Sequence, residues 1–214
     1  MPTKNNSHTN HRSRMRERYK RCGMDAFAEH EALEVYLYRC LRRVNTNDIA
    51  HNLLEKFGSL SRVFSRESRK QYREVDLVGD KTAFIMGSSA ENMERTMLGL
   101  MQDKPAYSVG KAMVFSRFML RRIPEDHVLI LRYDGVANFR DYTVLPDADD
   151  GTDWILQCLA QTKAGEEIHI RLPGNCLWTS DRCLKLGLEL RRHARKLRSV
   201  HRISHSGETE VIYE

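Results

Sequence analysis

Apolar residues in the first half of the chain recur every three or four positions, the spacing of amphipathic helices. Leu33, Leu37 and Leu41 follow this spacing and predict a helix over about 25–43. Asp25 precedes that stripe and can accept hydrogen bonds from the first free backbone amides, so it is the expected cap.

The next helix has the clearest signals at both ends. The polar run 45–48 interrupts the apolar pattern and supplies a cap, and Gly58 is a residue type that commonly ends helices. Between them, Ile49, Leu53 and Phe57 lie on one helical face. We therefore expect one buried face on this helix.

Shorter elements follow before a long helix. Helices are expected over 60–64 and 67–75, and the turn 75–83 leads into a helix that continues to about Met101. Its methionines fall at helical spacing, a pattern that is typical of a packed core.

The period changes in the second half. The short apolar run 128–131 is bounded by charges and predicts a buried strand, and Asp134–Gly135 is a hairpin signal. The other expected elements are a helix over 109–122, a strand over 138–145, a loop over 146–153, a helix over 154–161, a strand over 167–172, a helix over 180–198 and strands over 200–205 and 210–213. This order predicts an α/β sandwich around a mixed sheet.

Composition and local breaks suggest three segments. Residues 1–10 are polar and predict a disordered tail, 11–104 a helical domain, and 105–214 a second domain, with the boundary at Lys104–Pro105. No run is long and apolar enough for a membrane span, and the basic start lacks a signal core, so we expect a cytoplasmic protein.

The positive charge is concentrated at the beginning of the chain. The net charge is +6, and residues 1–21 account for all of it, whereas the remaining residues balance. The basic residues of this arm are Lys4, Arg12, Arg14, Arg16, Arg18, Lys20 and Arg21. Such an arm can release counterions from DNA phosphates, which makes DNA the expected partner, although a solubilising tail explains its first ten residues equally well.

Three segments of the first half resemble the RadC family, also classed as UPF0758. They are 11–19 (HRSRMRERY), 31–37 (EALEVYL) and 45–64 (NTNDIAHNLLEKFGSLSRVF). The resemblance implies an α+β fold, with an all-helical N-terminal domain of the helix-hairpin-helix type. An α/β MPN/JAB-like sandwich, similar to cytidine deaminases, would follow it.

The turn before the long helix falls where the family has its hairpin. Leu77 stands at the first hairpin glycine, and Gly79 keeps the second. The resemblance implies phosphate contact by Gly79, Lys81 and Thr82 at the helix start, where free backbone amides favour anions. A helix-turn-helix packing unit without DNA contact is the alternative.

The second half resembles the family mainly in layout, and the family's chemistry is that of JAMM metalloproteases. That chemistry needs zinc held by two histidines and an aspartate, a glutamate base and a serine at the oxyanion. Here Ile170 and Leu172 stand at the histidine positions, and Cys183 stands at the aspartate position. Asp126 replaces the glutamate, and Ser180 is retained. We therefore expect no catalytic residue, no metal and no cofactor at a degenerate site.

The alternative to a site without metal is a zinc site built from other residues of the second half. The five cysteines form no CxxC pair, which predicts reduced, mostly buried thiols. His169 should point away from Ile170, since neighbouring residues of a strand face opposite sides. The candidate ligands in this half are Cys176, Cys183, His169, His201 and His205.

Three hypotheses follow. The first is a non-catalytic RadC-like module for binding or scaffolding, associated with DNA through its arm; a link to DNA repair is implied by the family's name alone. The second is an active zinc hydrolase with relocated ligands. The third is a module that binds a protein partner or forms a homodimer, without a role on nucleic acid or membranes.

Overall fold

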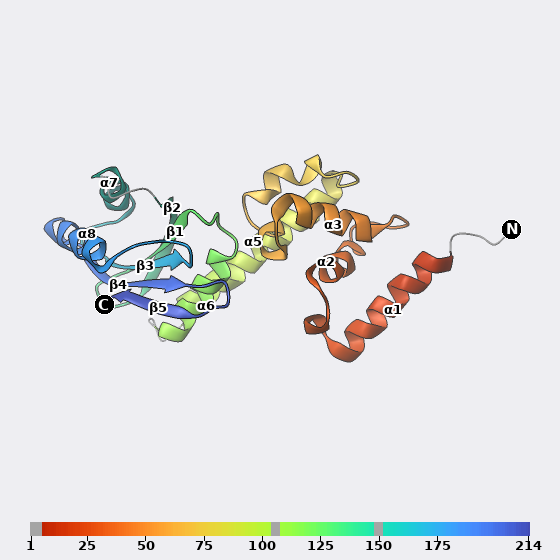
Figure 1. Ribbon diagram of the computed structural model, residues 1–214, viewed down its shortest axis with the longest axis horizontal. Coiled ribbons are helices and arrows are strands. Elements are labelled where there is room, and N and C mark those ends of the chain that lie inside the picture. Colours follow the sequence, from red (N-terminus) through yellow and green to blue (C-terminus); the bar gives the residue numbers. More distant parts are fainter. Residues whose placement is uncertain (1–5, 104–107, 148–151) are drawn as a thin grey trace. The chain divides into compact units, whose positions relative to one another are not determined.

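The computed structural model describes residues 6–103, 108–147 and 152–214 (Figure 1). Contacts within the chain divide it into two compact units, Met1–Met93 and Glu94–Glu214, so the division falls inside one long helix. The boundary predicted at Lys104–Pro105 lies outside the described residues. Each unit is described separately below.

Unit 1 is helical. Its elements in order are α1 (Asn6–Cys22), the 3-10 turn η1 (Met24–Ala26), α2 (Glu29–Leu37), α3 (Thr46–Phe57), α4 (Leu60–Val63), the 3-10 helix η2 (Ser68–Glu74) and the first part of α5 (Asp80–Gln102). The predicted long helix ending near Met101 is therefore present as α5. The two short helical segments before it are also present, the second as a 3-10 helix.

Helix α1 begins inside the segment that was predicted to be disordered. Residues 6–10 are helical, and residues 1–5 lie outside the described ranges. The strong helix formers among residues 14–20 explain the difference, because a helix that they start can extend back through weaker residues. The tail prediction for 6–10 was wrong.

Helix α2 is shorter than the helix predicted over 25–43. Asp25 lies in the preceding 3-10 turn, and the cap residue is Ala28, whose backbone N–H donates to Glu31 Oε2 at 3.0 Å. The carboxylate three residues into the helix thus replaces the expected cap. The α-helix ends at Leu37, and turns continue the chain.

Helix α3 confirms its sequence signals. Asn45 caps it by accepting a hydrogen bond from the Asn47 amide, and Gly58 ends it with a φ of 85°. A positive φ strains residues with a Cβ, so glycine suits this end. Ile49 and Leu53 are buried, as predicted for the apolar face.

Unit 2 is a mixed sheet covered by helices. Its elements after α5 are α6 (Val109–Leu120), β1 (His127–Tyr133), β2 (Phe139–Pro146), α7 (Thr152–Gln161), β3 (Glu167–Pro173), α8 (Ser180–Arg192), β4 (Lys196–Ile203) and β5 (Thr209–Tyr213). The strand order is β2-β1-β3-β4-β5. Among the described strands, β3 and β4 alone pair in parallel, which requires the crossover through α8.

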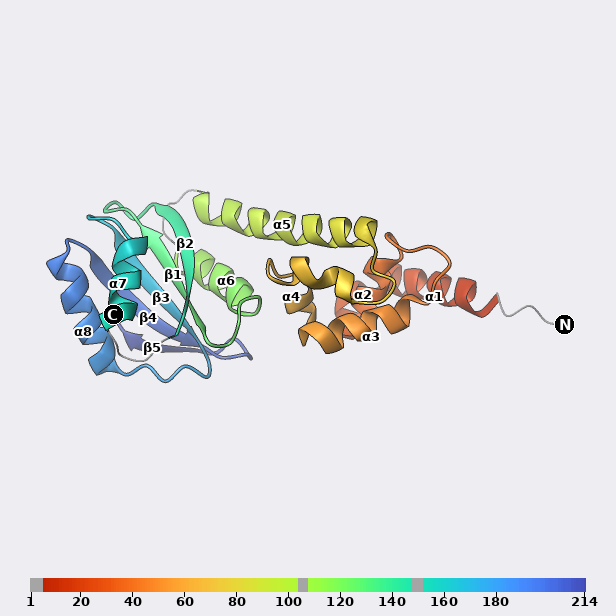
Figure 2. The same ribbon diagram turned by 90° about the horizontal axis from the view of Figure 1, so that it is seen from above.

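The two faces of the sheet pack against different helices (Figure 2). Ile130, Ile170 and Leu172 belong to the apolar cluster that includes residues of α7 and α8. Leu129 and Leu131 belong to the cluster that includes residues of α6. The alternation along β1 and β3 therefore produces an α/β sandwich, as the order of elements predicted.

Helix α8 is shorter than the helix predicted over 180–198. It ends at Arg192, and β4 begins at Lys196. Ala194 has a φ of 56°, so the backbone turns there. Leu197 continues the apolar spacing of the helix, but it is buried as a strand residue. The helical spacing predicted the wrong element for Leu197, because pairing with a neighbouring strand determines its conformation.

Part of the loop predicted over 146–153 lies outside the described residues. Pro146 ends β2, Asp147 is described, and α7 starts at Thr152. Within the described ranges, no helix is both long and apolar enough to cross a membrane.

Candidate functional site

Three of the five degenerate-site positions lie together in the core of unit 2. Ile170, Leu172 and Cys183 are all 0% exposed and belong to one apolar cluster. The strand supplies the first two from alternate positions on one face, and α8 supplies the third. Side chains that have no lone pair therefore fill the place where the resemblance puts two zinc ligands.

The other two positions do not join them. The Asp126 side chain is 77% exposed, and its carboxylate lies 2.8 Å from Nδ1 of His127. Ser180 begins α8 and donates its hydroxyl to the carbonyl of Ile212 at 3.2 Å. The side chains of Asp126 and Ser180 therefore make local structural contacts, away from the other three positions.

A carboxylate that we did not single out in the sequence organises the same region. Asp147 accepts hydrogen bonds from the Cys176 thiol at 2.7 Å and from the Trp178 indole at 2.8 Å. Arg182 of α8 also donates to Asp147, at 3.2 Å. The arrangement ties the end of β2 to the loop after β3 and to α8.

Aromatic rings complete this Asp147 cluster. The Arg182 guanidinium lies over the Trp178 ring at 4.1 Å, a cation-π geometry. Trp154 of α7 meets Trp178 edge-on at 4.9 Å and donates its indole N–H to the Pro146 carbonyl at 3.0 Å. The cluster is therefore a packed and hydrogen-bonded contact between loops and helices.

The thiols in this region are held in their neutral form. Burial, followed by the hydrogen bond to Asp147, raises the pKa of Cys176 to about 12. Burial raises the pKa of Cys183 to about 11. The thiolate is the form that binds zinc and that attacks electrophiles. These environments therefore disfavour both zinc binding and nucleophilic reactions by the two cysteines.

The residues at this site do not fit the zinc of the JAMM proteases. Zinc takes nitrogen, oxygen or sulfur ligands, and Ile170 and Leu172 offer none. Among the described residues, no three His, Cys, Asp or Glu side chains could hold a metal ion. His169 faces the other side of the sheet, as expected, with Nδ1 2.9 Å from the Ser199 hydroxyl and its ring edge-on to Tyr133.

Two arginines of the basic arm are used in the fold of unit 1. Arg12 donates to the carbonyls of Leu41 at 3.1 Å and Val44 at 2.9 Å. Arg18 donates to Glu31 at 2.7 Å and lies over the Phe27 ring at 4.5 Å. These contacts fix α1 on the rest of unit 1. They also use part of the arm's positive charge for interactions within the protein.

Three other arginines of the arm face solvent. Arg14, Arg16 and Arg21 are exposed and form no ion pair with any residue in the described part of the chain. Arg14 and Arg21 are seven residues apart, which places them on one side of α1. The charge available to an anionic partner is therefore smaller than the sequence suggests.

The predicted hairpin residues differ in accessibility. Lys81 is exposed at the start of α5, and a Cβ on Gly79 would meet nothing within 4 Å. Thr82 is 3% exposed, so its hydroxyl is not presented at the surface. Leu77 has a φ of 66° and is 65% exposed, so a branched residue adopts the left-handed backbone that suits the family's glycine.

The Asp147 cluster was missed because its members come from four separate segments of the chain, namely the end of β2, α7, the loop after β3 and α8. Asp147 appears in the sequence only as part of a polar loop, and Arg182 only as part of a basic helix. The tryptophans were the available signal, since the chain has 2 and both lie here. Their meeting depends on the loop lengths, which no local pattern specifies.

Over the described residues, the chain is an α+β protein with a five-stranded mixed sheet, and Ile170, Leu172 and Cys183 lie in the apolar core on one face of that sheet. A stretch of 54 residues, 25% of this chain, is 50% identical to UPF0758 protein FN0909 of Fusobacterium nucleatum subsp. nucleatum. That stretch spans 23% of the relative's length. No family model matches the chain, and no solved structure matches it significantly. The relation to UPF0758 proteins therefore extends to one quarter of the molecule.

Proposed function

We propose that this chain is a RadC-like protein that binds DNA through unit 1 and acts as a non-catalytic scaffold through its JAB/MPN-like unit 2. The burial of Ile170 and Leu172 in an apolar cluster carries the non-catalytic part of the proposal. A metal-dependent hydrolysis would need polar ligands at those positions. The UPF0758 similarity supports the family assignment on which the position of this site depends.

The DNA part is supported by the accessible charge of α1 and of the hairpin. Arg14, Arg16 and Arg21 project from α1, and Lys81 stands at the start of α5. Contacts with phosphates release counterions, so binding through these residues must weaken as the salt concentration rises. Arg12 and Arg18 contribute to DNA binding only indirectly, because their contacts fix α1 on the rest of unit 1.

The test replaces only the accessible arginines. The triple variant Arg14→Gln, Arg16→Gln and Arg21→Gln should weaken binding to duplex, branched or single-stranded DNA about tenfold or more, with a shallower salt dependence. Fluorescence anisotropy at several salt concentrations measures both quantities. Deletion of residues 1–21 is a poorer test, because it also removes the contacts of Arg12 and Arg18.

A matched triple variant controls for the change in net charge. Arg140→Gln, Arg191→Gln and Arg192→Gln remove three exposed arginines from unit 2, and binding should be unchanged. Equal losses in both variants, salt-independent binding, or no DNA binding by the unchanged protein would contradict the proposal.

Metal analysis tests the non-catalytic part separately. Protein purified without chelator should contain far less than one zinc per chain by elemental analysis. Stoichiometric zinc would instead support the hydrolase with relocated ligands. In that case, loss of zinc from Cys176→Ser or Cys183→Ser would identify the new ligands.

A specific surface favours a second candidate, a module that binds a protein or dimerises. Leu184 and Leu188 of α8 are 53% and 61% exposed, and they lie one helical turn apart. Leu156 of α7, which packs beside α8, is 55% exposed. Native mass measurement of the protein and of Leu188→Asp tests this candidate, since a dimer that dissociates in the variant would support it.

A further inference from the structure

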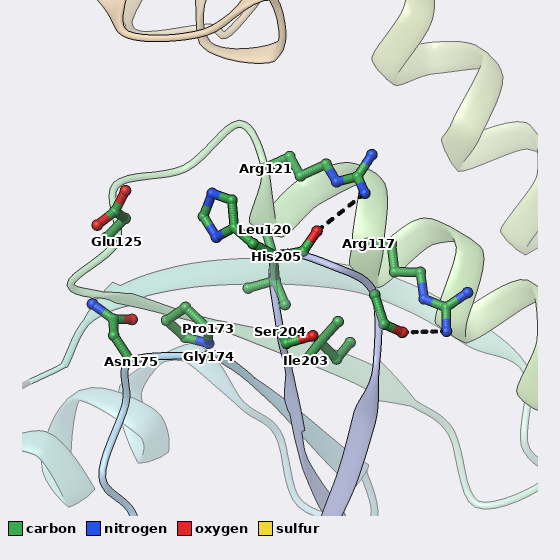
Figure 3. Close-up of a pocket in the computed structure, with 11 residues that line it drawn as sticks. Arg117, Leu120, Arg121, Glu125, Pro173, Gly174, Asn175, Ile203, Ser204 and His205 are labelled. Carbon is green, nitrogen blue, oxygen red and sulfur yellow. Dashed lines mark hydrogen bonds between the residues drawn. The ribbon is translucent and has the colours of Figure 1, made fainter.

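Unit 2 contains a cavity of about 380 Å³ that is separate from the degenerate site (Figure 3). It opens where β3 and β4 end, beside the last turn of α6. None of the five degenerate-site positions lines it. Its volume falls within the range of about 300–1,000 Å³ that is common for small-molecule sites.

Two arginines at the carboxyl end of α6 give the cavity its positive charge: Arg117 in the last turn of the helix and Arg121, its C-cap residue. Arg117 and Arg121 are four residues apart, so they share one helical face. Arg117 donates from Nη2 to the Gly207 carbonyl at 2.6 Å, and Arg121 donates from Nη2 to the His205 carbonyl at 3.4 Å. Neither guanidinium pairs with a carboxylate in the part of the chain that the structure describes.

These contacts leave hydrogen-bonding capacity in the cavity. A guanidinium has five N–H donors, and each arginine gives one of its nitrogens to a carbonyl of the β4–β5 turn. Figure 3 shows both guanidinium groups beside that turn, with Asn175 on the opposite wall. The remaining donors can serve a ligand that offers acceptors.

Glycines shape two walls of the cavity. A Cβ on Gly174 would lie 3.1 Å from Cα of Ser204, a tight contact, so a side chain there would push the loop after β3 and the end of β4 apart by a few tenths of an ångström. Gly207 has a φ of 91°, and Arg117 Nε lies 3.5 Å from where its Cβ would be. The walls and one arginine are thus held in place before any ligand arrives, which lowers the entropy cost of binding.

We propose that this cavity binds a phosphate monoester. Two arginines on one helical face suit a group with several oxygens and nearly two negative charges, because each guanidinium can take different oxygens. Glu125 also lines the cavity, and its carboxylate places a negative charge in the lining that opposes the charge of the ligand. A free nucleotide and the phosphorylated end of a nucleic acid share this chemistry.

Calorimetric titration of the full chain carrying Arg14→Gln, Arg16→Gln and Arg21→Gln, which weakens DNA binding through α1, tests the proposal with four probes. They are inorganic phosphate, a nucleoside monophosphate, a 5′-phosphorylated oligonucleotide and the same oligonucleotide without the phosphate. Binding of the monophosphate identifies a small ligand, and binding of only the phosphorylated oligonucleotide identifies a nucleic-acid end. If none of the phosphorylated probes binds, or if the unphosphorylated oligonucleotide binds equally well, the proposal is overturned.

Two single variants should weaken phosphate binding. Arg117→Gln and Arg121→Gln should each reduce affinity about tenfold or more, because a charge-assisted hydrogen bond is lost. Arg191→Gln, which removes an exposed charge on α8, should leave affinity unchanged. An equal loss in all three variants would show only a general charge effect and would overturn the assignment to this cavity.

A gain of affinity provides a result that misfolding cannot produce. Glu125→Gln removes the opposing charge from the cavity lining and should strengthen phosphate binding several-fold. Unchanged or weaker binding in this variant would contradict the proposed position of the phosphate. The α1 triple variant should bind the small probes normally, so failure of the DNA proposal and failure of this one remain distinguishable.

Discussion

Glu34 in unit 1 and Asp147 in unit 2 are carboxylates that each join several elements, but their surroundings differ. In unit 1, Glu34 is 2% exposed and accepts from Tyr38 at 3.0 Å, with His11 at 3.2 Å. Thr46 and Asn47 reach it at 3.4 Å from the start of α3. Glu34 thus connects α1, α2 and α3 through polar side chains.

In unit 2, Asp147 performs the same joining role beside an apolar core. Its partners are a thiol, an indole and one guanidinium, and the thiol of Cys176 and the indole of Trp178 belong to the same apolar cluster as Ile170 and Leu172. The comparison teaches that unit 1 keeps its charged residues largely for its fold. In unit 2, a carboxylate instead joins a strand end, a loop and a helix beside the apolar core of an α/β sandwich.

The largest effect is expected from removing the charge of Glu34. Glu34→Gln keeps the side-chain size but presents an amide to hydrogen-bond donors, which should lower the free energy of unfolding by about 3 kcal/mol. Urea unfolding measures the change. Glu55→Gln on the exposed face of α3 is the control and should be nearly neutral. Similar small effects in both variants would show that Glu34 is not an organising residue.

The Asp147 cluster should be somewhat less sensitive, because its ion pair is partly exposed. Side chains of Asp147 and Arg182 are 22% and 18% exposed. Asp147→Asn should therefore cost about 2 kcal/mol of unfolding free energy, and the fluorescence of the adjacent tryptophans should change. Asp141→Asn, at the 56% exposed end of a surface pair with Arg132, should cost less than about 0.5 kcal/mol. If both variants lost the same unfolding free energy, Asp147 would contribute no more to stability than a surface carboxylate does.

These two carboxylates also show how far sequence reasoning reaches. Cap and glycine signals around α3 are local, so they predicted its ends, and the short apolar run of β1 predicted a buried strand. The end of α8 was not predictable, because Leu197 fits both a helical stripe and a strand. The partners of Asp147 are about 30 residues away in sequence, and their meeting depends on the packing of β2, β3 and α8.

Acid should weaken unit 2 through a histidine of its core. Burial first, and then Arg171, lowers the pKa of His169 to about 3, from an ordinary value of 6.5. Between these pH values the unfolded chain binds the proton more readily, so stability falls as the pH decreases below about 6.5. The loss between pH 7 and 5.5 should be about 1 kcal/mol. His169→Asn should flatten the pH dependence of urea unfolding over that range, and an unchanged slope would contradict this assignment.

The smallest effect concerns the turn that precedes α5 in unit 1, where Leu77 has a φ of 66°. A left-handed backbone costs a residue with a Cβ about 1–2 kcal/mol, whereas glycine gains flexibility in the unfolded chain worth about 0.5–1 kcal/mol. Leu77→Gly should therefore stabilise the protein by about 0.5 kcal/mol. Leu177→Gly, at an 86% exposed leucine of unit 2 without a positive φ, should instead destabilise it.

The Leu77→Gly variant also tests whether this turn contacts DNA. If the turn contacts phosphate, Leu77→Gly should strengthen DNA binding, because the exposed side chain no longer limits the approach of the backbone. Stabilisation without stronger DNA binding would assign the turn to packing alone and leave the arginines of α1 as the DNA contact.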